Sequence, residues 1–353
     1  MDRPVVAVIL AGGTGSRLYP ASRSDRPKQF LALGDSDDDR SLLARTAART
    51  GFADATLVAT RPEFADEVPD HAPDAEVVVE PAGKDTGPAI VYATHRARDA
   101  VDGDPVVVVL PADHHVPDGD AFEATMERGA RVAAETDRLV AFGVEPTRPA
   151  TGYGYVEPGE EHSSDGSAVD YRDLAAFHEK PDGETAAEYV DAGYYWNAGI
   201  FAWTPAALFD QARDTPLGPL VGELDSPDPN PVAGFDAVDP VSIDYAVMER
   251  ADRAAVVPAD FAWDDLGAWD ALERVLDADD RADADGNVVA GDAEALAVDA
   301  ADNVVAGDEK HVSLVGVEGL CVVAYDDRVL VVPTGEAQRV RDAVDRLKAT
   351  GRF

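Results

Sequence analysis

A glycine-rich turn close to the start of the chain has the chemistry of an anion-binding loop. Residues 4–11 (PVVAVILA) are all apolar, and glycines follow at positions 12, 13 and 15. Backbone N–H groups at such a turn can bind phosphate oxygens, and the guanidinium of Arg17 adds a charged, forked donor. The segment is not a Walker A loop, and Leu18 stands where the dinucleotide fingerprint needs glycine. We expect a phosphate-binding turn, with a turn that binds nothing as the alternative.

Lysine is rare in this chain, and its positions are therefore informative. Three of the five lysines, Lys28, Lys84 and Lys180, stand in short segments marked by glycine or proline. A compact ammonium group on a flexible stem suits a phosphate. We expect Lys28 and Lys180 to meet phosphates, whereas Lys84 is equally compatible with a solvated surface position.

A carboxylate stands where another apolar run ends. Val106–Leu110 is apolar, and Asp113 follows it after two residues. Ligands bind beyond the carboxyl ends of strands in open α/β sheets, and a carboxylate there can hold Mg²⁺ against a bound phosphate. The alternative is a turn cap. His114 and His115 come next, but adjacent side chains on an extended backbone point to opposite sides, so the two make a poor zinc site.

These residues need a scaffold that brings strand ends together. Apolar runs alternate with segments of helical spacing over the first 144 residues. The pattern predicts an α/β fold with a doubly wound, mixed and mostly parallel sheet, similar to a Rossmann fold. The strands are expected at 4–11, 55–59, 77–80, 106–110 and 139–144, and the helices at 41–50, 87–100 and 121–136.

The rest of the chain changes in texture. Aromatic and glycine-rich segments at 151–204 predict further strands, residues 214–240 read as a Pro- and Asp-rich loop, and a helix is expected at 242–251. Residues 275–286 are acidic and resemble a linker. Short Val-rich strands at 287–333 predict a small C-terminal β domain, for which a β-helix-like stack is one arrangement, and a terminal helix follows at 335–349. We therefore divide the chain into domains at 1–280 and 286–353.

The charge of the chain is strongly negative. Asp and Glu number 69 against 30 Lys and Arg, which gives a formal net charge of −39. Such a surface repels nucleic acid. Because molar salt screens repulsion between carboxylates, we expect a cytoplasm of high salt content, with an ordinary acidic cytoplasmic protein as the alternative. No apolar run is long enough to span a membrane, no basic stretch marks a signal peptide, and the lone Cys321 forms no intrachain disulfide.

Nine segments of the chain together form a recognisable set. In chain order they are LAGGTGSRLYP, PKQFLAL, EPAGKDTGPAI, LPADHHV, TGYGYVE, HEKPD, YYWNAGIF, SIDYAVME and WDDLGAWDAL. These segments, in this order, resemble the mannose-1-phosphate guanylyltransferases of the sugar nucleotidyltransferase superfamily. Departures are Tyr19, where many members have Trp, and Gly83-Lys84-Asp85, where a pattern with arginine is common. Some relatives carry a fused phosphomannose isomerase domain, whose activity we do not expect here.

The resemblance implies an enzyme that converts GTP and mannose 1-phosphate into GDP-mannose and diphosphate by in-line attack on the α-phosphorus. It implies Mg²⁺ or Mn²⁺ as cofactor and a homodimer as the assembly. Two alternatives stay open. One is a glucose-1-phosphate uridylyl- or thymidylyltransferase of the same superfamily, and the other is a non-catalytic subunit that senses nucleotide sugars.

The resemblance also assigns site residues. The catalytic set is Arg17, Lys28, Asp113, Lys180 and Asp265. The metal ligands are Asp113 and Asp265, and Asp264 is the less favoured neighbour. The nucleotide-binding set is Leu10, Ala11, Gly12, Gly13, Gly15, Glu80, Asp85, Thr86, Pro111 and Asp113. The set for the sugar phosphate is Gly152, Tyr153, Glu179, Lys180 and Asn197.

Some of these residues have structural alternatives. Asp85 or Thr86 can cap the following helix, and the aromatic residues at 194–196 can belong to the core. Pro181 should bias Lys180 towards an extended backbone, and either side of the Asn197 amide can bind a hydroxyl.

Overall fold

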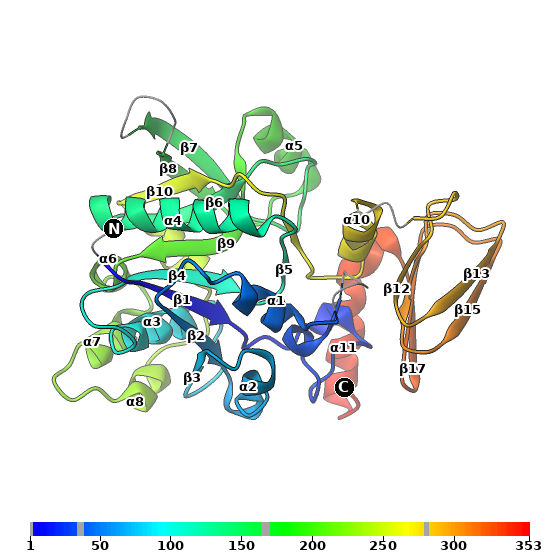
Figure 1. The fold of residues 1–353 in the computed structure, drawn as a ribbon, viewed down its shortest axis with the longest axis horizontal. Helices are drawn as coiled ribbons and strands as arrows, with labels where there is room; N and C mark the ends of the chain where they lie inside the picture. Colours follow the sequence, from blue (N-terminus) through cyan, green and yellow to red (C-terminus); the bar gives the residue numbers. More distant parts are fainter. Residues whose placement is uncertain (1–2, 34–38, 164–169, 279–281) are drawn as a thin grey trace. The chain divides into compact units, whose positions relative to one another are not determined.

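The computed structural model describes residues 3–33, 39–163, 170–278 and 282–353 (Figure 1). The chain forms two compact units, each built from separate stretches of sequence. The sheet unit comprises Met1–Gly12, Ala47–Pro111 and Pro117–Ala262, and the β-helix unit comprises Gly13–Thr46, Ala112–Val116 and Trp263–Phe353. These units group residues that lie close together in space, whichever part of the sequence they come from. The domain boundary that we predict between residues 280 and 286 divides the sequence into two continuous stretches, and it stays a prediction.

A nine-stranded mixed sheet forms the centre of the sheet unit, in the order β3-β2-β1-β4-β9-β6-β10-β8-β7. The first four strands in this order are parallel, whereas β9 runs antiparallel to both β4 and β6. The mixed, mostly parallel sheet of an α/β fold that the sequence predicts is confirmed. The strands are β1 (Val5–Leu10), β2 (Ala55–Thr60), β3 (Glu76–Val79), β4 (Val106–Pro111), β6 (Leu139–Val144), β7 (Tyr155–His162), β8 (Tyr171–His178), β9 (Tyr195–Trp203) and β10 (Ala254–Pro258).

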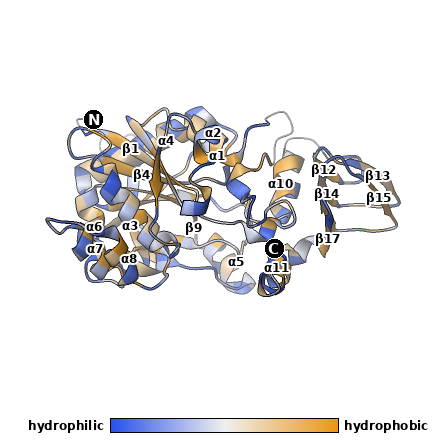
Figure 2. Ribbon diagram, turned by 90° about the horizontal axis from the view of Figure 1, so that it is seen from below, coloured by the Kyte–Doolittle hydropathy of each residue, from blue (hydrophilic) through white to orange (hydrophobic). Residues whose placement is uncertain are grey.

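The central strands are apolar on both faces because helices cover them. Val6 to Ile9 of β1 are fully buried, and Figure 2 colours β1 and β4 as hydrophobic. Helix α3 (Thr86–Ala97) packs on β1, β2 and β4, and helix α4 (Gly119–Thr136) packs on β4, β6, β9 and β10. The remaining helical segments between β2 and β9 are η3 (Pro62–Phe64), α2 (Val68–His71) and α5 (Gly183–Asp191).

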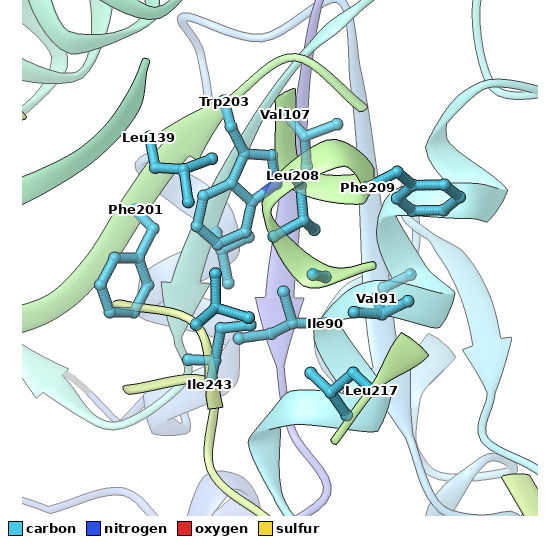
Figure 3. Packing of buried hydrophobic residues seen from close by; sticks show 14 of the residues in the cluster. Ile90, Val91, Val107, Leu139, Phe201, Trp203, Leu208, Phe209, Leu217 and Ile243 are labelled. Carbon is cyan, nitrogen blue, oxygen red and sulfur yellow. The ribbon is translucent and has the colours of Figure 1, made fainter. Parts of the chain in front are cut away.

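The core of this unit gathers around β9. Trp203 and Phe201 from β9 pack with Leu208 and Phe209 of the following helix and with Ile90 of α3 (Figure 3). The indole nitrogen of the buried Trp203 donates a hydrogen bond to the Thr94 hydroxyl at 3.2 Å, which satisfies its polar group.

The prediction of a loop at 214–240 is wrong, because two short helices form there. They are α7 (Gly218–Leu224) and α8 (Pro231–Asp236), which follow α6 (Pro205–Ala212). A proline in the first turn begins each of them, where its missing N–H costs nothing. The buried Leu220, Val221 and Phe235 form the apolar faces of α7 and α8. These faces are not apparent from the Pro- and Asp-rich composition of the segment.

The helix expected at 242–251 is shorter than predicted. It consists of α9 (Ile243–Ala246) and a separate 3₁₀ turn, η4 (Met248–Arg250). Of the acidic linker expected at 275–286, residues 275–278 belong to helix α10 (Asp270–Ala278), and residues 279–281 lie outside the described residues. No helix in the described part of the chain has the length and apolar character needed to cross a membrane.

The β-helix unit stacks short strands in coils. Strands β12 (Val288–Gly291), β14 (Val304–Gly307) and β16 (Leu320–Tyr325) are parallel neighbours, and β13 (Glu294–Val298) is parallel to β15 (His311–Val315) on the other side of the coil. An asparagine ladder supports the stack, since the amide of Asn303 donates to the Asn287 side chain at 2.8 Å. The predicted β-helix-like domain with a terminal helix is confirmed.

A hairpin strand and the terminal helix complete this unit. Strand β17 (Arg328–Pro333) pairs antiparallel with β16, and η5 (Thr334–Arg339) leads into α11 (Val340–Ala349). The core of the unit joins Leu18 from the N-terminal segment to Trp269, Cys321 and Val344. The remaining elements here are η1 (Ser16–Leu18), η2 (Lys28–Phe30), β5 (His114–His115) and β11 (Asp264–Asp265), together with all but the last two residues of α1 (Leu42–Ala48).

Candidate active site

Two carboxylates from distant parts of the sequence meet in the β-helix unit. Strands β5 and β11 form a short antiparallel ladder in which Asp265 lies opposite His114. Asp113 directly precedes β5. One ligand atom from each of Asp113, His114 and Asp265 lies within 4.8 Å of the others. The ladder thus brings together the two predicted metal ligands and adds one of the two neighbouring histidines.

The chemistry of this group suits a divalent cation. Oδ1 of Asp265 is buried and has no hydrogen-bond partner among the described residues, and carboxylate oxygens are the ligands that hard cations prefer. Asp264 is engaged elsewhere, because Arg274 donates to its two oxygens at 2.8 and 2.9 Å. The less favoured Asp264 therefore has a structural role in this geometry.

Lys28 lies beside this acidic group. Its ammonium forms an ion pair with Oδ2 of Asp113. Burial lowers the pKa of Lys28, Asp265 opposes that shift, and Arg17 adds to it. Gly15 makes room for the lysine stem: its φ is +63°, and a β-carbon on it would lie 2.5 Å from carbon atoms of the Lys28 side chain. Both the backbone conformation and the contact therefore require glycine at position 15.

Arg17 stands on a well-anchored turn. The Leu18 amide donates to the Gly15 carbonyl at 2.9 Å, and the Ser22 hydroxyl donates to the same carbonyl at 2.5 Å. The Arg17 guanidinium donates to Oε1 of Gln338 in η5 at 2.7 Å. Gly13 is exposed, with open space around its α-carbon. The glycine turn thus carries Arg17 and, at Gly15, contacts the side chain of Lys28.

In the sheet unit, a buried carboxylate follows strand β3. Glu80 is only 5% exposed, and a β-carbon on Gly12 would lie 2.8 Å from its Oε1. Burial raises the pKa of Glu80 to about 7, against the opposing effect of Arg61. No hydrogen bond joins its carboxylate to another residue in the described ranges. Glu80 can therefore serve a ligand, either as an acceptor or, when protonated, as a donor.

Three other residues predicted to bind the nucleotide, Leu10, Ala11 and Pro111, lie in the sheet unit at or just after the ends of strands β1 and β4. Leu10 pairs with Pro111 at the carboxyl ends of β1 and β4. The Ala11 amide donates to the Ala59 carbonyl at 2.8 Å, and its own carbonyl accepts from the Thr60 hydroxyl at 2.9 Å. The main chain of Ala11 is thus committed to the sheet.

The segment from Lys84 to Thr86 is held by structural hydrogen bonds. Lys84 donates to the carbonyls of Phe235 and Val238 at 2.7 and 2.8 Å. Asp85 is the N-cap of α3, and the Thr86 hydroxyl accepts from the Ile243 amide at 3.0 Å. The capping alternative for Asp85 is therefore observed, and Lys84 and Thr86 fasten the segment that carries α9.

A carboxylate that the sequence reasoning did not select lies next to Asn197. The Asn197 side chain donates to Oδ1 of Asp244 at 3.0 Å and accepts from the Gly199 amide at 2.9 Å. Burial, and then the nearby charge of Glu179, raise the pKa of Asp244 to about 6. Both ends of the Asn197 amide are engaged, so this side chain orients Asp244.

Glu179 and Lys180 lie close to this pair. Their side chains form an ion pair at 2.9 Å, and a β-carbon on Gly154 would lie 3.1 Å from Oε2 of Glu179. The expectation of an extended backbone at Lys180 is wrong, because its φ is +34°.

The aromatic residues of this region divide between core and surface. Trp196 and Tyr155 are core residues, 2% and 0% exposed. Tyr153 contacts the Trp196 ring edge-on with centroids 5.2 Å apart, while Gly152 is exposed with open space around it. Of the residues predicted to bind the sugar phosphate, Tyr153 and Gly152 are therefore accessible in this region.

Comparisons with known proteins agree with the resemblance. A family model described as "Nucleotidyl transferase" matches residues 6–281, and one described as "MannoseP isomerase/GMP-like beta-helix domain" matches residues 293–347. Mannose-1-phosphate guanylyltransferases of Escherichia coli and Sinorhizobium fredii are each 35% identical over 98% of this chain, which covers 74% and 68% of their lengths.

Solved structures extend the comparison. One described as a mannose-1-phosphate geranyltransferase from Thermus thermophilus has a TM-score of 0.85 and 35% identity, over 98% of this chain and 99% of that one. A UDP-glucose pyrophosphorylase structure, 12% identical with a TM-score of 0.51, shares the fold alone. The chain therefore belongs to the nucleotidyl transferase family and, within it, to the mannose-1-phosphate guanylyltransferases.

Proposed function

We propose that this chain makes GDP-mannose and diphosphate from GTP and mannose 1-phosphate. The observation that carries the proposal is the meeting of Asp113 and Asp265 beside Lys28, with ligand atoms within 4.8 Å of one another. The 35% identity over 98% of the chain with two proteins named mannose-1-phosphate guanylyltransferase supports these substrates.

The reaction needs alignment and charge compensation rather than a protein nucleophile. A phosphate oxygen of mannose 1-phosphate attacks the α-phosphorus of GTP. As that bond forms, the bond from the α-phosphorus to the bridging oxygen breaks, and diphosphate leaves on the opposite side with the electron pair. Both reactants are anions, so Arg17, Lys28 and the amides of the glycine turn accelerate the reaction by binding phosphate oxygens.

Asp113 and Asp265 are the proposed ligands of the divalent cation. Oxygen donors favour Mg²⁺, with Mn²⁺ as a substitute, whereas the imidazole of His114 is a donor that later transition metals prefer. When bound, the cation neutralises charge on the triphosphate. Lys28, which forms an ion pair with Asp113, supplies a second positive charge to the triphosphate.

Glu80 is the proposed contact for guanine. Its ionised carboxylate can accept hydrogen bonds from N1–H and the N2 amino group, a donor pair that uracil and thymine do not offer. The assignment of Asp85, Thr86, Leu10, Ala11 and Pro111 to the nucleotide stays a prediction.

Asp244 and Glu179 are the proposed acceptors for mannose hydroxyls. Asn197 holds Asp244 in place through the 3.0 Å hydrogen bond. Lys180 offers a cation for the sugar phosphate, and Tyr153 and Gly152 border the sugar.

The acidic surface suggests where the enzyme works. A net charge of −39 opposes compaction at low ionic strength, and the screening length falls to about 3 Å in molar salt. We propose a cytoplasm of high salt content as its location and a homodimer as its assembly.

Product analysis tests the proposed function. The purified chain is incubated with Mg²⁺, with GTP, ATP, UTP or dTTP, and with mannose 1-phosphate or glucose 1-phosphate, and nucleotide sugar and diphosphate are quantified. GDP-mannose should form fastest. Dominant UDP- or dTDP-glucose would reassign the substrates, and a lack of product with every pair would favour the sensing role.

A further inference from the structure

We propose that Gln338 is a positioning residue that orients the Arg17 guanidinium towards the triphosphate while leaving its charge uncompensated. The inference rests on the proposed function, which gives Arg17 a phosphate to bind. The two residues belong to the same unit although they are 321 positions apart, and their side chains are joined by a hydrogen bond of 2.7 Å.

The backbone beneath Arg17 is fixed, whereas its side chain has one hydrogen-bond partner. Leu18 is 1% exposed and belongs to the core cluster that also contains Val340 and Val344 of α11. In the described part of the chain, the guanidinium of Arg17 hydrogen-bonds only to Gln338. A long, flexible side chain loses rotamer freedom when it binds a ligand, so a partner that restricts it beforehand lowers that cost.

The neutrality of Gln338 is informative in so acidic a chain. Carboxylates outnumber cationic side chains by 69 to 30, yet Arg17 forms no ion pair with any described residue. The acids nearest to Gln338 in sequence, Glu336 and Asp342, both pair with Arg339, at 2.9 and 3.8 Å. An amide oxygen can orient a guanidinium without cancelling its charge, which a carboxylate would do.

One hydrogen bond also leaves Arg17 free to bind. A guanidinium has five N–H donors, and Gln338 uses one of them, on Nη1. The amide can therefore hold the side chain while the remaining donors face a phosphate. If instead the Arg17–Gln338 hydrogen bond had to break before GTP could bind, removing the Gln338 side chain would increase the affinity for GTP. If Gln338 orients Arg17, the same removal decreases that affinity.

The test compares Gln338→Ala and Gln338→Glu with the wild type. The matched control is Ala349→Glu, which adds the same charge at an exposed position of α11. The KM values for GTP and mannose 1-phosphate are measured, together with GTP affinity by calorimetry, at the lowest KCl concentration that keeps the protein folded and again in molar KCl. Calorimetry makes the comparison independent of turnover.

Gln338→Ala should weaken GTP binding about threefold, the typical value of one exposed hydrogen bond. Gln338→Glu should weaken it further, by roughly tenfold, because the new carboxylate competes with the triphosphate for Arg17, and molar KCl should reduce that excess. The KM for mannose 1-phosphate and the melting temperature should not change, and Ala349→Glu should resemble the wild type.

The double variant Arg17→Ala/Gln338→Glu separates the possible failures. In the Arg17→Ala background, Gln338→Glu should have no further effect on GTP affinity. A persisting effect, unchanged affinity in the Gln338 variants, or tighter binding by Gln338→Ala would overturn the inference while leaving the proposed function intact. If Arg17→Ala itself binds GTP normally, both the inference and the proposed role of Arg17 are wrong.

Discussion

Gly267 lies against the carboxylate of Asp265: a β-carbon on this glycine would lie 2.8 Å from Oδ2 and 3.2 Å from both Cγ and Oδ1. Glycine at this position therefore gives the Asp265 side chain the space that it occupies. Since only the end of a side chain would have to move, an added methyl group should displace the carboxylate while costing the fold little.

Gly267→Ala should raise the Mg²⁺ concentration needed for half-maximal activity by about tenfold, the effect expected when a metal ligand is disturbed but present. Activity should recover as Mg²⁺ is increased, and the melting temperature should change little. Titration of activity with Mg²⁺ measures the shift. The control is Gly222→Ala on an exposed face of α7, which has open space around it. An unchanged Mg²⁺ requirement would show that Asp265 does not depend on Gly267.

Glu80 should make GTP binding depend on pH. Its pKa of about 7 means that the ionised form, which accepts from guanine, increases as the pH rises from 6 to 8. The KM for GTP should therefore fall over this interval, and Glu80→Gln should remove the dependence and raise KM above pH 7. The exposed Glu67→Gln is the control. A KM for GTP that is flat with pH in the wild type would contradict the guanine contact.

The same residue predicts a stability effect with a defined sign. Because the folded-state pKa of Glu80 is raised, the protonated form is favoured by folding, and that contribution is lost as the pH rises from the ordinary glutamate value through about 7. Glu80→Gln should therefore melt at a higher temperature than the wild type at pH 8 and at a similar temperature at pH 5. Calorimetric melting at both values measures this difference.

Asp244 should affect the sugar phosphate rather than the nucleotide. With its pKa raised to about 6, it loses charge below that pH, and the KM for mannose 1-phosphate should then rise. Asp244→Asn should raise this KM about tenfold at pH 8, as expected for a lost hydrogen bond to a charged group, and leave the KM for GTP unchanged. Asp236→Asn in α8 is the control. Equal changes in both KM values would point to a general structural role.

Salt should stabilise the folded chain. As KCl rises from dilute to molar concentration, screening of the carboxylates should raise the melting temperature by several degrees. Sucrose serves as the control for solute exclusion, which stabilises proteins without screening charge. A melting temperature that is equal in dilute and molar KCl would remove the proposal of salt adaptation.

The sequence predicts best those elements whose residues alone determine their structure. The apolar runs that become β1, β4 and β6 could be predicted because a buried parallel strand is apolar on both faces. The sequence does not reveal helices α7 and α8 because they are short and lie within a segment, residues 214–240, that is rich in Pro and Asp. Only a few buried side chains, among them Leu220 and Phe235, hold them in place.

Tertiary relations were harder to predict. The resemblance proposed Asp113 and Asp265 as partners, but the two-residue ladder of β5 and β11 that brings them together has no periodicity to detect. Asp244 lies in the segment SIDYAVME, but an acidic residue in the first turn of a helix is common, and the burial of Asp244 against Asn197 is a tertiary contact that the sequence does not show. The contact of Arg17 with Gln338 joins residues that no local pattern connects.

Direct binding of Mn²⁺ tests the central claim, which is that Asp113 and Asp265 together hold the divalent cation. Electron paramagnetic resonance of Mn²⁺ with the wild type, Asp113→Asn and Asp265→Asn, each in the presence of GTP, gives the affinity, and circular dichroism checks the fold. Both variants should bind Mn²⁺ at least tenfold more weakly and lose turnover by orders of magnitude while staying folded. Wild-type affinity or near-normal turnover in either variant would contradict the account.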